Sequence, residues 1–158
     1  NFTQEAIIAR MGLFITSALT MVLLPEISKT EAEKPKHLVR TAILISGGIG
    51  GMFCIICWTF PDYLLQIFFS SKASESIYLP KLSLIYALVA MLNLIFIINL
   101  GRGNYLAQKI YFIAILFFSI VLFVINLSNI NKFIYLMITF LVILLLINFF
   151  KSIKQILN

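Results

Sequence analysis

Long runs of apolar residues dominate the chain, and short polar segments separate them. An α-helix rises about 1.5 Å per residue, so about 20 apolar residues match a hydrocarbon core of about 30 Å. The short run 63–70 predicts a helix that lies at the membrane interface, because it follows Trp58 and Tyr63, whose rings favour the headgroup level. Apolar and polar residues do not alternate as in barrel strands, so we expect an all-α integral membrane protein. The longer runs predict five spanning helices, over residues 6–24, 41–60, 82–100, 110–127 and 133–150.

Composition supports this interpretation, since the chain is 61% hydrophobic and 11% charged, whereas a soluble domain is about 25% charged. The net charge of +6 does not indicate a nucleic-acid partner, because the basic residues lie in separate connections between the predicted spans. Cys54 and Cys57 form a CxxC, a candidate redox or metal pair. The chain has no second CxxC, and His37 is its only histidine. We therefore interpret both cysteines as small apolar residues of a span.

The lysines and arginines of the connections predict the orientation. Connections alternate between the two sides, and eight of these residues fall on one side against three on the other. The positive-inside rule places the side that is richer in lysine and arginine, together with the C-terminus, in the cytoplasm. We expect the protein to lie in the inner membrane of the cell. The charged connection 26–40 is a docking or regulatory loop, or a solvated connection. The eight are Lys29, Lys34, Lys36, Arg40, Arg102, Lys109, Lys151 and Lys154, and the three are Lys72, Lys81 and Lys132.

A few small and polar residues interrupt the predicted spans. Gly47 and Gly51 form a GxxxG, which lets two helix backbones approach closely or gives a moving helix a flexible point. Asn93 and Asn99 are six residues apart, so they do not share a helical face. Each is able to bond across helices, cap the span or face a substrate.

Arg10 lies inside the first predicted span, where an arginine costs at least about 2.5 kcal/mol unless it reaches water or protein. It either extends to the interface or serves as a cavity cation that grips a phosphate through two parallel hydrogen bonds. Glu5 is close enough along the chain to form a weak ion pair with it. Arg10 and Asn93 are the candidate substrate-binding residues. No catalytic constellation and no phosphate-binding glycine loop is present, so we expect neither an enzyme nor a cofactor or metal.

Several segments carry a family resemblance. Residues 9–14 (ARMGLF), 17–19 (SAL) and 23–28 (LLPEIS) resemble the oligosaccharide and polysaccharide flippases of the MOP superfamily, in which a span with an arginine near its start ends at a proline. Pro25 would thus mark the end of the first helix. A charged loop, a span rich in small residues, and then 60–65 (FPDYLL) and 68–69 (FF) follow in the family's spacing. Ser70 stands where a glycine is usual, and beyond residue 100 the match is one of hydropathy alone.

The resemblance implies a two-lobed helical bundle that carries a lipid-linked sugar to the outer leaflet by alternating access, with Arg10 in its cavity. The chain begins at Asn1 without a signal peptide, and we expect it to be the C-terminal lobe of a longer protein. Its implied partners are the lipid-linked glycan, membrane lipids and the missing N-terminal lobe. A multidrug exporter of the same superfamily is the alternative, although it would need an acid that residues 41–60 and 82–150 do not supply. A second alternative is a non-transporting membrane subunit or a membrane-embedded glycan enzyme.

Overall fold

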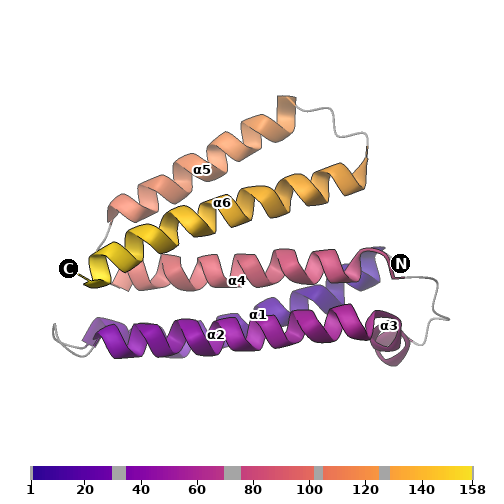
Figure 1. Cartoon of the computed structure of the whole chain (residues 1–158), viewed down its shortest axis with the longest axis horizontal. Coiled ribbons are helices and arrows are strands. Elements are labelled where there is room, and N and C mark those ends of the chain that lie inside the picture. Colours follow the sequence, from indigo (N-terminus) through magenta and orange to yellow (C-terminus); the bar gives the residue numbers. More distant parts are fainter. Residues whose placement is uncertain (1, 30–34, 70–75, 102–104, 125–128, 158) are drawn as a thin grey trace.

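The chain folds into helices over the residues that the structure describes. The computed structural model describes the backbone of residues 2–29, 35–69, 76–101, 105–124 and 129–157 (Figure 1). The side chain of His37 and the predicted connections at 30–34, 70–75, 102–104 and 125–128 lie outside the described residues. The helices are α1 (Phe2–Lys29), α2 (Pro35–Thr59), α3 (Pro61–Phe69), α4 (Leu79–Gly101), α5 (Tyr105–Val124) and α6 (Ile130–Leu157).

The all-helical fold predicted from the apolar runs is confirmed, and α3 matches the short helix predicted over 63–70 to within two residues. Three of the described segments are long and apolar enough to cross a membrane by length and composition: Arg40–Thr59, Leu79–Leu100 and Ile130–Asn148. The chain is therefore a multi-pass membrane protein. The segment Gln108–Phe123 of α5 is apolar but shorter. Spanning by α1 and α5 stays a prediction.

Prolines and one asparagine fix where several helices begin. Pro35, Pro61 and Pro80 stand in the first turns of α2, α3 and α4. A proline has no N–H to donate, but the first N–H groups of a helix have no intrahelical partner in any case. At the start of α6 the side-chain Oδ1 of Asn129 accepts a hydrogen bond from the backbone N–H of Asn131 at 3.0 Å. This bond caps the helix.

Pro25 does not end its helix, and the exit predicted there is wrong. The helix α1 continues past this proline to Lys29. A proline inside a helix removes one backbone hydrogen bond and pushes the preceding turn aside. The remaining backbone hydrogen bonds keep α1 helical on both sides of Pro25. The proline therefore lies in the last turns of the helix and does not mark its end.

The helix α4 is the centre of the bundle, because it contacts α1, α2, α5 and α6. Figure 1 shows that α1, α4 and α6 begin at the end of the bundle where α3 lies, while α2 and α5 run in the opposite direction. We call this the α3 end. The helix α5 diverges from the others and has few contacts with them (Figure 1). The short helix α3 lies across the direction of the long helices, as expected of an interfacial helix.

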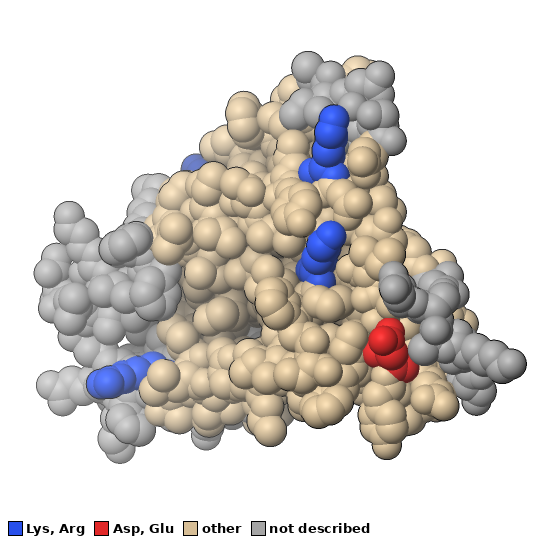
Figure 2. Space-filling view, turned by 45° about the vertical axis from the view of Figure 1, so that its right-hand side comes forward, with Lys and Arg blue, Asp and Glu red and all other residues tan. Residues whose placement is uncertain are grey.

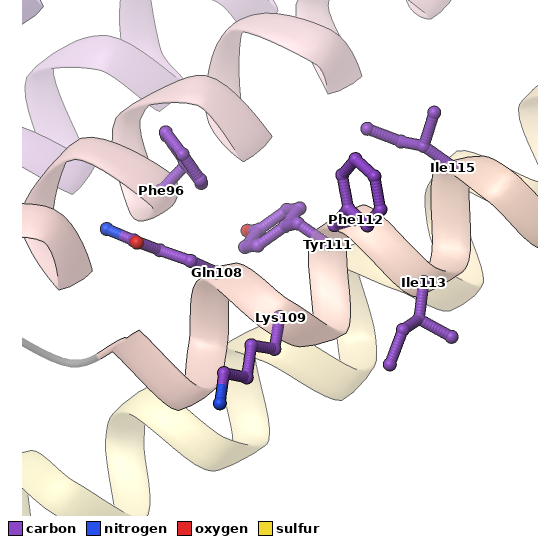
Figure 3. Close-up of a pocket in the computed structure, with 7 residues that line it drawn as sticks. All are labelled: Phe96, Gln108, Lys109, Tyr111, Phe112, Ile113 and Ile115. Carbon is purple, nitrogen blue, oxygen red and sulfur yellow. The ribbon is translucent and has the colours of Figure 1, made fainter.

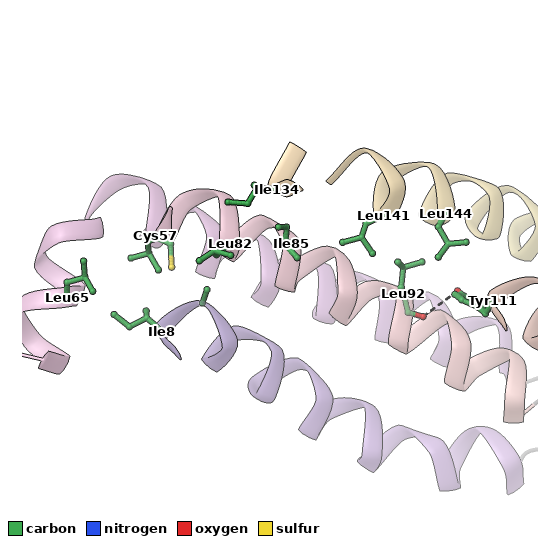
Figure 4. Close-up of a cluster of buried hydrophobic side chains, with 12 residues drawn as sticks. Ile8, Cys57, Leu65, Leu82, Ile85, Leu92, Tyr111, Ile134, Leu141 and Leu144 are labelled. Atoms are coloured by element: carbon green, nitrogen blue, oxygen red, sulfur yellow. Dashed lines mark hydrogen bonds between the residues drawn. The ribbon is translucent and has the colours of Figure 1, made fainter. Parts of the chain in front are cut away.

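The hydrophobic core joins all six helices. Figure 4 shows buried side chains lying along α4 and meeting those of the neighbouring helices. The core reaches from Leu65 of α3 to Leu144 of α6. Its members are Ile8, Ala9, Cys57, Leu65, Leu79, Leu82, Ile85, Leu92, Tyr111, Ile134, Leu141 and Leu144.

Polar contacts at the α3 end hold the starts of the helices together. Glu5 of α1 is 2% exposed, and its Oε2 accepts a hydrogen bond from the backbone N–H of Tyr78 at 2.7 Å. The Glu5 carboxylate thus binds at the N-terminus of α4, where a negative charge is favourable. Arg10 forms no ion pair among the described residues. The pairing predicted between Glu5 and Arg10 is therefore wrong, because the carboxylate is used between helices.

Two further contacts at this end link α2 and α3 to the start of α4. The indole Nε1–H of Trp58 donates to the backbone oxygen of Pro80 at 3.1 Å. The Oδ1 of Asp62 accepts from the backbone N–H of Ser76 at 3.1 Å and from its hydroxyl at 2.7 Å. Ser76 and Pro80, just before and at the start of α4, are thereby bonded to both preceding helices.

Glycines allow α1, α2 and α4 to approach closely. A Cβ on Gly12 would lie 2.5 Å from Cδ1 of Phe53, so the ring occupies the space that any side chain at this position would need. On α2, a Cβ on Gly50 would lie 3.8 Å from the Cβ of Ala87. The close contacts of these helices therefore centre on Gly12 and Gly50.

The surface is mostly uncharged. Figure 2 shows a face on which a few basic and acidic side chains stand apart within a continuous area of other residues. Many large apolar side chains are exposed on α1, α2, α5 and α6, among them Met52 of α2 and Phe123 of α5, which is 94% exposed. Hydroxyls on exposed helix faces, such as those of Ser119 and Thr139, donate to a carbonyl of their own helix four residues earlier. Lipid can cover the apolar side chains, and these two hydroxyls are already paired within their own helices.

Candidate functional site: a groove between the helices

A cavity of about 470 Å³ lies between α1, α4, α5 and α6. We call it the inner groove. Its walls are apolar except for Ser17 and Asn93, and Ser17 already donates to the backbone oxygen of Phe14 at 3.1 Å. Its size falls in the range of small-molecule sites. The lining residues are Leu13, Phe14, Ser17, Val89, Leu92, Asn93, Phe96, Tyr111, Ile115, Phe140, Leu141 and Leu144.

Asn93 is the polar feature of the inner groove. Its side chain is half-buried and has no hydrogen-bond partner among the described residues. The residue lies inside the membrane-spanning segment Leu79–Leu100. An amide without a partner in hydrocarbon costs several kcal/mol. The carboxamide therefore needs a polar group that enters the groove, such as water, a ligand or a side chain of another helix.

A second cavity, of about 530 Å³, lies beside the first part of α5. We call it the α4–α5 groove. Figure 3 shows Gln108 and Tyr111 projecting from α5 on the side that faces Phe96 of α4, while Lys109 and Ile113 point to the other side. The Nε2 of Gln108 is buried without a hydrogen-bond partner among the described residues. This groove thus repeats the pattern of the inner groove, an unpaired amide among apolar walls.

The two grooves share a wall. Phe96, Tyr111 and Ile115 line both of them. The rings of Phe96 and Tyr111 pack edge to face with centroids 5.4 Å apart, and the hydroxyl of Tyr111 donates to the backbone oxygen of Leu92 at 3.4 Å. These contacts attach the first half of α5 to α4. Tyr111 therefore forms part of the wall between the two grooves.

Arg10 is not among the residues that line either groove. Its side chain is exposed. It precedes Leu13, Phe14 and Ser17 by three, four and seven residues, and this spacing places all four on one face of α1. Arg10 thus lies one turn beyond the inner groove, toward the α3 end. Of the two predicted residues, Asn93 lines the inner groove. Arg10 lies outside the groove, on the face of α1 that carries Leu13, Phe14 and Ser17.

The lining carries little charge. Lys109 is the only charged residue that lines the described walls, and it points away from the α4–α5 groove (Figure 3). The buried acid of the bundle, Glu5, lies at the α3 end and is bonded to a backbone N–H. The grooves therefore suit a neutral ligand that combines apolar surface with hydrogen-bonding groups, and they lack the carboxylate that a bound cation would need.

The glycine and cysteine motifs lie away from the grooves. A Cβ on Gly47 would lie 3.6 Å from Cε of Met91, whereas one on Gly51 would have nothing within 4 Å. Helix packing at this pair stays a prediction. Cys54 and Cys57 are free thiols. The described residues contain no group of three potential metal ligands.

Sequence reasoning did not single out Gln108, Tyr111 or Phe96. Gln108 carried a usable signal, since an amide at the start of an apolar run needs a partner once the helix enters the membrane. The aromatic residues carried none, because one ring among many apolar residues gives no indication of the face on which it lies. No family of known proteins, no curated protein and no solved structure matches the chain.

Proposed function

We propose that the chain is the C-terminal lobe of a transporter that flips lipid-linked oligosaccharide or polysaccharide precursors across the inner membrane by alternating access. The proposal starts from the resemblance of residues 6–100 to the MOP-superfamily flippases. The observation that supports it best is the carboxamide of Asn93, which has no partner among the described residues and lies in a groove between spanning helices. Under this proposal α1 and α5 also cross the membrane, and the C-terminus is cytoplasmic.

The chemistry of the grooves favours a glycan over a cationic drug. Planar amides donate and accept hydrogen bonds at once, which suits the hydroxyls of a sugar. Asn93 and Gln108 supply such amides beside the rings of Phe96 and Tyr111. Arg10, one turn along the same face of α1, supplies a cation for the phosphate that links a glycan to its lipid. A multidrug exporter would use a carboxylate there, and none lines the described grooves.

Complementation of a flippase-deficient strain tests the proposal with the full protein. Arg10→Ala and Asn93→Leu should abolish export at normal abundance in the membrane. Arg10→Lys should restore export in part, because an ammonium cannot reproduce the two-pronged grip of a guanidinium on phosphate. Arg40→Ala, an exposed arginine of α2, and Thr139→Val, an exposed hydroxyl of α6, are the matched controls. Normal export by both test variants would refute the proposal.

Two further measurements separate the alternatives. Loss of cationic-dye efflux in the same variants, with glycan export intact, would favour a multidrug exporter. Loss of neither activity would favour a non-transporting subunit or a glycan enzyme. Single cysteines at positions 34 and 132 test the orientation: an impermeant thiol reagent should label position 132 from outside the cell and leave position 34 unlabelled.

A further inference from the structure

Four residues form a cluster where α4 and α6 begin. The ammonium Nζ of Lys81 donates a hydrogen bond to Oδ1 of Asn131 at 3.1 Å. It lies 5.2 Å from the ring centroid of Tyr135 and 6.0 Å from that of Tyr78. Rings at these distances attract a cation through their π faces. We call these four residues the Lys81 cluster, and its contacts hold the ammonium in one place.

No acid of the described residues balances the charge of Lys81. The side chain is half-buried and forms no ion pair among the described residues. The described acids of this end are used elsewhere: Glu5 binds the backbone N–H of Tyr78, and Asp62 binds Ser76. An ammonium has three N–H donors, and Asn131 takes one of them. Donors remain for another acceptor.

The helix ends add positive potential at the same place. The N-termini of α4 and α6 meet at the Lys81–Asn131 hydrogen bond, and each carries about half a positive charge. Glu5 offsets the charge of α4, whereas the cap of α6 is the neutral side chain of Asn129. Lys132, which is exposed, follows Asn131 directly.

The location identifies the source of a suitable anion. Leu79 and Ile130 are the first residues of two segments that can span the membrane, so the cluster lies at headgroup level. Tyrosines are enriched at that level. We propose that the Lys81 cluster binds the phosphate of an anionic phospholipid of the surrounding bilayer. The site is separate from the grooves and does not depend on transport.

Native mass spectrometry of the full protein tests this, with phosphatidylglycerol as the probe and phosphatidylcholine as the neutral reference. The wild-type protein should retain phosphatidylglycerol preferentially, and less of it as salt is raised. Lys81→Met should lower its affinity about five-fold, the contribution of one lysine near an anionic lipid surface. Lys81→Arg should keep most of the affinity. Arg40→Met, at an exposed position in the first part of α2 and at the opposite end of the bundle, should change nothing.

Three results would overturn the assignment. The first is wild-type binding of phosphatidylglycerol by Lys81→Met. The second is an equal loss of both phospholipids, which would indicate a general effect on the lipid belt. The third is binding of a polyprenyl diphosphate that requires Lys81 while phosphatidylglycerol does not bind, because the phosphate would then come from a carrier lipid. If Lys81→Met fails to fold, Lys81→Arg and the salt dependence decide the question.

Discussion

Replacing Gly12 by alanine tests how closely α1 and α2 pack. The new Cβ would lie 2.5 Å from Cδ1 of Phe53 and 2.8 Å from Cε1. Carbon atoms in contact are about 3.5–4.0 Å apart, so the ring or one of the helices must move by about 1 Å. Phe53 is half-buried and packs against the core, which limits the directions in which its ring can turn. We therefore expect Gly12→Ala to strain the bundle.

The size of the effect follows from two opposing terms. Overpacking of a well-packed core costs about 1–3 kcal/mol. Alanine favours a helix over glycine by about 1 kcal/mol, and this gain applies to any helical glycine. Gly51→Ala on α2 is the matched control, because its Cβ would have nothing within 4 Å. The free energy of unfolding of Gly12→Ala should lie about 1–3 kcal/mol below that of Gly51→Ala.

Equilibrium unfolding of the purified protein in lipid nanodiscs measures this difference. Phe53→Leu removes the ring that causes the clash, so Gly12→Ala should cost less in that background. The coupling between the two changes should exceed about 0.5 kcal/mol, as is usual for residues in contact. Equal unfolding free energies for Gly12→Ala and Gly51→Ala, unaffected by Phe53→Leu, would refute the close packing of α1 on α2.

Three more changes test individual contacts. Glu5→Leu leaves the N–H of Tyr78 unpaired and should cost about 1–3 kcal/mol in thermal unfolding, whereas Glu5→Gln keeps an acceptor and should cost less; equal losses would contradict the bond. Phe118→Ala removes a ring stacked on Phe140 at 4.2 Å and should speed hydrogen exchange in α5 more than in α4; unchanged exchange would contradict the anchoring role of this pair. Trp58→Phe removes one hydrogen bond to the start of α4 and should cost about 0.5–1.5 kcal/mol, and wild-type stability would show that the bond contributes nothing.

The helices were predictable because the physics that forms them is local. Apolar runs of membrane length lead to helices whatever lies beside them, and the prolines at the starts of α2, α3 and α4 act within one turn. The rule that a proline ends a helix failed at Pro25. There the free-energy cost of one lost hydrogen bond was smaller than the stabilisation from the other contacts of the helix. Local rules thus predict that a helix exists better than they predict where it ends.

The contacts between helices were not predictable from the same patterns. Glu5 and Arg10 are close along the chain, but the acid bonds to Tyr78, which lies 73 positions away. The tight contact of Gly12 with Phe53 was not predicted, because it depends on which face each helix turns to its neighbour, and the packing role of Gly47 and Gly51 stays a prediction. Asn93 was identified because an amide inside a span needs a partner wherever it faces. Gln108 carried a similar signal, but the groove that it lines could not be predicted.

The weak attachment of α5 has a consequence for how the protein is made. Two sets of aromatic contacts hold this helix: Tyr111 on α4, and Phe118 on Phe140 of α6. Synthesis delivers α5 to the membrane before α6 exists, so only the first contact is available at that stage. The inner groove, which α6 closes with Phe140 and its neighbours, then faces lipid on one side. A ribosome that stalls between the two helices would leave an open bundle, which membrane proteases would recognise through an α5 held by its contact with α4 alone.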